Sequence, residues 1–105
     1  MSVRVNEDNF DAEVLQSEAA VLADFFSDGC VPCKRLAPVL AEIEEALPDK
    51  IKVVKININF NAELTERYEV QAAPTLVFFN NGVEVSRLRG AIQKAEIIDT
   101  INNLQ

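Results

Sequence analysis

The chain has 105 residues, of which 49% are hydrophobic, and this predicts one domain, residues 1–105, that folds without a metal or a cross-link. Its net charge of −7 argues against nucleic acid and anionic membranes as partners. No apolar run approaches the roughly 18 residues that a membrane span needs, and residues 1–9 lack a signal-peptide pattern, so we expect a cytoplasmic monomer whose partners are proteins or small molecules.

Two short elements open the chain. Residues 2–5 are compatible with an edge strand. Asp8 or Asn9 can cap the helix that follows, whose apolar side carries Phe10 and Val14. This segment carries little chemistry.

The next three elements predict a strand, a helix and a strand. Residues 20–26 are apolar without alternation, as in a central strand covered on both faces. The helix that follows Cys33 has one apolar stripe, formed by Leu36, Val39, Leu40, Ile43 and Leu47. It stops at Pro48, and residues 51–58 form a β-branched strand. This order implies a right-handed crossover and a parallel pair.

The rest of the chain predicts a helix, a hairpin and a last helix. Asn61 can cap a helix that runs to about Tyr68. Strands at residues 75–79 and 83–89 are joined by the hairpin signal Asn80-Asn81-Gly82. A final amphipathic helix is expected to cover the other face of the sheet, through Ile97, Ile98, Ile101 and Leu104. The sum is an α/β fold of order βαβαβαββα, with a mixed sheet between helices.

The only two cysteines, Cys30 and Cys33, stand at the start of the long predicted helix. Residues three apart there have Cβ atoms about 5 to 6 Å apart, so a small adjustment closes a disulfide. The helix N-terminus also favours a thiolate, the reactive form of the group. We expect Cys30, nearer the loop, to be the exposed nucleophile. Cys33 is expected to be the shielded resolving thiol that breaks the mixed disulfide.

Two other uses of this cysteine pair are less favoured. A zinc site lacks further ligands, because the chain has no third cysteine and no histidine. A structural cross-link across so short a loop contributes only about 2 kcal/mol. We therefore expect a redox site with no metal and no bound cofactor.

Asp24 is a carboxylate inside an otherwise apolar strand. Burial would raise its pKa, and with no histidine in the chain it is the best placed proton acceptor for Cys33. The alternative is that the strand twists and leaves Asp24 in water, and the sequence leaves both open. Lys55, on the neighbouring strand, either offsets the buried charge or is an ordinary strand lysine whose ammonium group reaches solvent.

The chain resembles the thioredoxin family from about Phe10 to its end. The residues that carry the resemblance are, in order, Ala23-Asp24-Phe25-Phe26, Cys30-Val31-Pro32-Cys33-Lys34, Pro38, Lys55, Ala73-Pro74-Thr75, Asn81-Gly82 and Gly90. The resemblance implies the thioredoxin fold, with about five strands and about four helices. It also implies reversible dithiol-disulfide exchange with protein substrates, with Cys30 as the attacking thiol and Cys33 as the resolving thiol.

The resemblance further implies a substrate groove. The Ala73-Pro74 bond would be cis and would face the cysteines, with the backbone of Ala73 pairing with an extended substrate. Gly90 would lie beside the groove, although the residue by itself is equally compatible with a strand terminator. Without the resemblance, a trans bond is the ordinary expectation. Pro38 would lie inside the long helix and kink it, the alternative being a first-turn proline.

Four residues depart from the family pattern. Gly29 and Phe26 stand where tryptophans are usual, Val31 replaces the usual glycine between the cysteines, and Asn59 replaces an aspartate. Gly29, Val31 and Pro32 are expected to contact the substrate next to the cysteines. The departures favour a specialised set of partners.

These observations predict a protein-disulfide reductase that carries electrons from a thioredoxin-reductase-like donor to disulfide-containing proteins and supports cell redox homeostasis. One alternative is a dedicated electron donor to a single enzyme complex. Another is a thioredoxin-like module that binds peptides without turnover.

Overall fold

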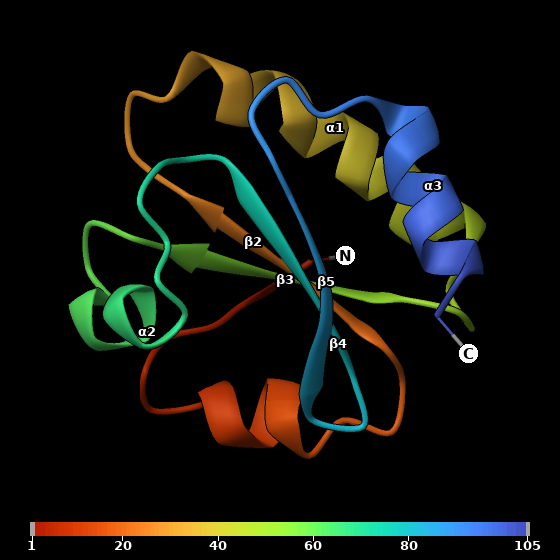
Figure 1. The fold of residues 1–105 in the computed structure, drawn as a ribbon, viewed down its shortest axis with the longest axis horizontal. Helices are drawn as coiled ribbons and strands as arrows, with labels where there is room; N and C mark the ends of the chain where they lie inside the picture. The colour runs from red at the N-terminus through yellow and green to blue at the C-terminus, as the bar shows by residue number, and fades with distance from the viewer. Residues whose placement is uncertain (1, 105) are drawn as a thin grey trace.

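The computed structural model describes residues 2–104. The elements follow in the predicted order (Figure 1): β1 (Val3–Arg4), the π-helical turn η1 (Asp11–Leu15), β2 (Val21–Phe26), α1 (Val31–Ala46), β3 (Lys52–Asn57), α2 (Ala62–Arg67), β4 (Thr75–Asn80), β5 (Val83–Arg89) and α3 (Lys94–Asn102). The predicted order βαβαβαββα is confirmed. Pro38 lies inside α1, as the resemblance implied, so the alternative of a first-turn proline is wrong.

The five strands form one mixed sheet in the order β1-β3-β2-β4-β5. β2 runs parallel to β3, which confirms the predicted parallel pair. β4 runs antiparallel to both β2 and β5, which confirms the hairpin of β4 and β5. β2 is the middle strand, and five of its six residues are buried. Because its side chains are covered from both faces, its apolar run shows no alternation.

The helices cover both faces of the sheet, with a different arrangement from the one expected. α3 lies on the same face as α1 (Figure 1), where Ile97 and Ile101 pack in one cluster with Leu36 and Leu40. The prediction that α3 covers the other face is therefore wrong. η1 and α2 cover that face, with Phe10, Val14, Leu64 and Val70 in the second cluster. An apolar stripe predicts that a helix is buried, but the stripe carries no information about which face it meets.

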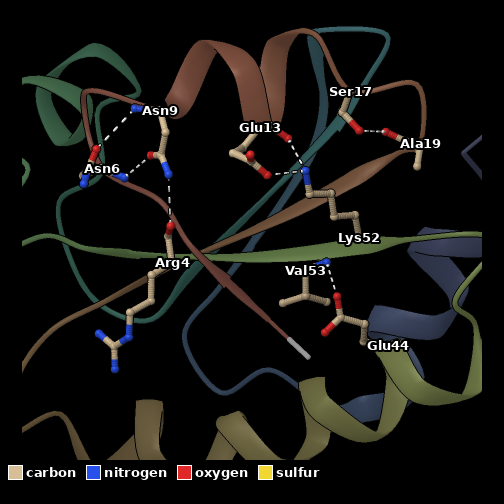
Figure 2. Close-up of polar contacts among 9 residues, drawn as sticks. All are labelled: Arg4, Asn6, Asn9, Glu13, Ser17, Ala19, Glu44, Lys52 and Val53. Atoms are coloured by element: carbon tan, nitrogen blue, oxygen red, sulfur yellow. Dashed lines mark hydrogen bonds and ion pairs between the residues drawn. The ribbon is translucent and has the colours of Figure 1, made fainter.

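Neither Asp8 nor Asn9 caps η1 with its side chain, because the N-cap residue is Phe10. The Asn9 amide instead closes the loop before η1. Its Oδ1 accepts from the Asn6 N–H at 2.7 Å, and its Nδ2 donates to the Arg4 carbonyl at 3.2 Å (Figure 2).

Asn61 occupies the N-cap position of α2, but its side chain makes no capping bond. The Nδ2 atom of Asn61 donates to the Asn57 carbonyl at 2.9 Å. The Glu7 carboxylate accepts from the Glu63 N–H at 2.8 Å. A residue distant in the sequence therefore satisfies a donor at this helix start.

Two glutamates, from helical segments on opposite faces of the sheet, accept hydrogen bonds from residues of β3 (Figure 2). The Lys52 Nζ donates to the carboxylate of Glu13 at 2.7 Å and to its carbonyl at 2.9 Å. On the other face, Oε2 of Glu44, from α1, accepts from the Val53 N–H at 3.0 Å. These contacts fix both layers against the strand that pairs with β2.

Asn81 and Gly82 form the two-residue turn between β4 and β5, with φ of 54° and 78°. Positive φ at both central positions is the conformation that an Asn-Gly hairpin favours, and the hairpin prediction is confirmed. The Ala73-Pro74 bond is cis, as the family resemblance implied.

Candidate active site

Cys30 and Cys33 lie between the C-terminal end of β2 and the start of α1. Cys30 is the N-cap residue of α1, with φ −81° and ψ 107°, and its Sγ accepts from the Cys33 N–H at 3.2 Å. The two residues form a disulfide, with Cα atoms 5.2 Å apart. Three-residue spacing at a helix start therefore produces the pairing that was predicted.

The two cysteines differ in their access to solvent. Cys33 is 6% exposed, whereas Cys30 is half-buried and follows the exposed residues Asp28 and Gly29. Val31 is 53% exposed, and Pro32 is exposed as well. Cys30 is therefore the more solvent-accessible residue of the pair.

Asp24 is buried, with 2% of its surface exposed, so the alternative of a water-exposed carboxylate is wrong. Burial raises the pKa of Asp24 to about 6, and the positive charge of Lys55 opposes part of that rise. Within residues 2–104 its buried Oδ1 has no hydrogen-bond partner. Strand alternation places Asp24 on the same face as Leu22, which is the face that α1 covers with Leu36.

Lys55 is the register partner of Asp24 across the parallel pair β2 and β3. Its side chain is half-buried, and its Nζ lies 5.9 Å from the centroid of the Phe26 ring. Within the described part of the chain, the two side chains form no ion pair. Lys55 therefore lowers the pKa of Asp24 through the electric field of its charge, without a direct ion pair between these two described residues.

A groove of about 440 Å³ lies beside the cysteines and brings together four of the predicted substrate-contacting residues: Pro32, Ala73, Pro74 and Gly90. Two more predicted residues, Gly29 and Val31, are exposed and lie outside its lining. The groove is completed by residues that the sequence reasoning missed: Arg35, Leu36, Val39, Ala91, Ile92 and Gln93. The spacing of Pro32, Arg35, Leu36 and Val39 was the available signal, because these positions share one helix face.

A second feature that the sequence did not reveal holds the loop before Cys30. The Asp28 N–H donates to Oδ1 of Asn59 at 2.9 Å, and the Asp28 carboxylate accepts from Nδ2 of Asn57 at 3.1 Å. Because Asn57 ends β3 and Asn59 follows it, these bonds join the loop to the strand next to β2. Asn59, which departs from the family pattern, therefore has a defined structural role.

Among residues 2–104, no group of three or more Cys, Asp or Glu side chains is arranged to hold a metal ion. No helix in the same range is both long and apolar enough to cross a membrane.

A disulfide at a helix start that joins a half-buried cysteine to a buried one, beside a groove with a cis-proline, defines a thiol-disulfide oxidoreductase. The thioredoxin family model matches residues 1–103. The chain is 39% identical over 103 residues to the thioredoxin of Rickettsia bellii, covering 98% of both chains. It is 37% identical to thioredoxin 1 of a Nostoc species, covering 95% of this chain and 94% of the relative.

The chain belongs to the thioredoxin family and has the thioredoxin fold, with a five-stranded mixed sheet and helices on both faces. It is a protein-disulfide reductase of the thioredoxin type. Membership implies, in general terms, substrates that contain disulfides and a reductase that supplies electrons.

Proposed function

We propose that this protein, as a single monomeric domain, is a general cytoplasmic reductant in an electron transport chain that maintains redox homeostasis. A thioredoxin-reductase-like donor would reduce it, and disulfide-containing proteins would oxidise it. The observation that carries the proposal is the Cys30–Cys33 disulfide at the start of α1, with Cys33 buried and Cys30 accessible.

In the first step the Cys30 thiolate attacks one sulfur of the substrate disulfide. A bond forms between this sulfur and Cys30, and the other substrate sulfur leaves as a thiolate. The helix N-terminus supports the thiolate form of Cys30.

In the second step Cys33 loses its proton and attacks Sγ of Cys30. This attack forms the Cys30–Cys33 disulfide and releases the second substrate thiolate, so two electrons pass to the substrate. Asp24 accepts the Cys33 proton in this proposal. Its support is a buried carboxyl group on the face of the sheet that α1 covers, with a pKa raised to about 6 by burial. Lys55 adjusts that pKa.

The substrate segment would lie in the groove, between Pro32 on one side and Ala73, Pro74 and Gly90 on the other. The backbone of Ala73 would pair with it as an added strand does. Gly29 and Val31 would contact the part of the substrate that extends past Cys30, since both are exposed beside it.

The test is reduction of a protein disulfide by the parent, Cys30→Ser and Cys33→Ser, with a dithiol that returns the oxidised enzyme to its reduced form. Both variants should lose turnover, and only Cys33→Ser should trap a mixed disulfide. Alkylation of the reduced parent should label Cys30 first. A mixed disulfide trapped through Cys33 would contradict the assigned roles.

A dedicated electron donor to one enzyme complex is the second candidate. It is favoured by the small Gly29 and the β-branched Val31 at exposed positions beside Cys30, where the family usually has Trp and Gly. Comparison of kcat/KM for several unrelated disulfide proteins separates the two functions. Similar values support the general reductant, and one dominant substrate supports the dedicated donor.

A further inference from the structure

The groove beside the cysteines contains one ionisable side chain. Within the part of the chain that the structure describes, its lining consists of apolar residues, one glycine, Gln93 and Arg35. In an apolar groove, the few polar groups fix the orientation of the ligand and provide the specificity of binding. Arg35 is therefore the residue best placed to distinguish substrates by charge.

Arg35 is also uncommitted within the protein. Four other cations have carboxylate partners: Lys52 with Glu13, Arg67 with Glu63, Arg87 with Glu84, and Lys94 with Glu42. The exposed side chain of Arg35 forms neither an ion pair nor a hydrogen bond with residues 2–104. Its planar fork of N–H donors, suited to a carboxylate, is therefore free for a ligand.

We propose that Arg35 is a specificity-determining residue that selects substrate segments with an acidic side chain near the attacked cysteine. The inference rests on the proposed function, because it requires the substrate to lie in the groove. Arg35 is five positions beyond Cys30, which bonds to the substrate cysteine, or about 7.5 Å along the helix axis. An extended segment advances about 3.3 Å per residue. The matching carboxylate therefore lies about two residues from the substrate cysteine.

The expected preference is local. The net charge of −7 disfavours acidic substrates at long range, so a preference for them must come from the groove. Arg35 is exposed, and exposed ion pairs are screened by water and salt, which limits the gain to roughly two- to fivefold in kcat/KM.

The experiment uses disulfide peptides that differ only in having Glu, Gln or Lys two residues before, or two residues after, the attacked cysteine. Reduction by the full-length protein is measured at low salt. At one of the two positions the parent should prefer Glu over Gln by roughly two- to fivefold. Arg35→Gln should abolish the preference, and Arg35→Glu should reverse it in favour of Lys.

Lys34→Gln is the matched control. It removes the same charge from the adjacent exposed residue, which lies outside the groove lining, and it should retain the Glu preference. Equal kcat/KM for Glu and Gln peptides at both positions in the parent would overturn the inference, as would equal loss of the preference in both variants. Failure of the parent to reduce even the Gln peptides would instead refute the proposed function.

Discussion

Asp24 and Lys55 are register partners in the parallel pair β2 and β3. The burial of Asp24 and the charge of Lys55 have opposite effects on the pKa of Asp24. Burial raises the pKa of Asp24 to about 6, while the charge of Lys55 lowers it by a smaller amount. Desolvation therefore outweighs the charge of the neighbouring strand.

The buried carboxyl group should make stability depend on pH. Its folded pKa of about 6 exceeds the unfolded value of about 3.9, so its ionisation opposes folding. The free energy of unfolding should fall by roughly 2 kcal/mol between pH 4 and pH 6 and level off above about pH 7. Asp24→Ala should lack this contribution and be more stable than the parent at neutral pH.

Urea unfolding of the oxidised protein between pH 4 and pH 8 measures this effect. The exposed Asp99, on α3, provides the control, because Asp99→Ala should retain the slope of the parent. An identical slope in Asp24→Ala and the parent would show that Asp24 does not titrate as stated.

Asp24→Ala should also slow the attack of Cys33 on the mixed disulfide. General-base assistance contributes at least about 100-fold to the rate in typical enzymes. Because hydroxide and water replace part of this assistance, we expect the rate of the Cys33 attack to fall roughly tenfold or more at pH 7. Single-turnover release of the reduced substrate measures this step. Alkylation of Cys30, which needs no proton transfer from Cys33, is the control. An unchanged release rate at pH 7 would remove Asp24 from the proton transfer.

Lys55→Met should raise the pKa of Asp24 further above 6, because the favourable positive charge is lost. A carboxyl-carbon NMR titration of Asp24 measures the change. Lys52→Met removes the same charge from the same strand, but Lys52 pairs with Glu13 on the opposite face. This control should leave the Asp24 titration near that of the parent. A downward shift in Lys55→Met would contradict the assigned cause.

Gly82→Ala should destabilise the protein more than Gly90→Ala. Both glycines have positive φ, 78° and 84°, so both substitutions introduce backbone strain of about 1–2 kcal/mol. A Cβ atom at Gly82 would also lie 2.7 Å from the Leu15 carbonyl oxygen, whereas one at Gly90 would meet nothing within 4 Å. We expect an additional loss of about 1–3 kcal/mol for Gly82→Ala. Equal losses of stability for the two variants in urea unfolding would show that the Leu15 carbonyl moves away from the added Cβ atom at no cost.

Local patterns were sufficient to predict most of the elements. The unbroken apolar run of β2 indicated a strand buried on both faces, and Asn81-Gly82 indicated a two-residue hairpin turn. The spacing of Cys30 and Cys33 indicated a disulfide at a helix start. Each of these three patterns involves residues that are close in the sequence, within about one helical turn or two positions along a strand. Neighbouring residues therefore contain the information that the prediction needs.

The sequence by itself determined the order of the elements and the chemistry of the cysteine pair. The tertiary structure decided that α3 shares a face with α1, that Asp24 is buried, and that Arg35 lines the groove. Burial and groove formation depend on segments far apart in the chain, such as α1 and residues 90–93. Periodicity shows which side of an element is apolar, but only packing determines what covers it.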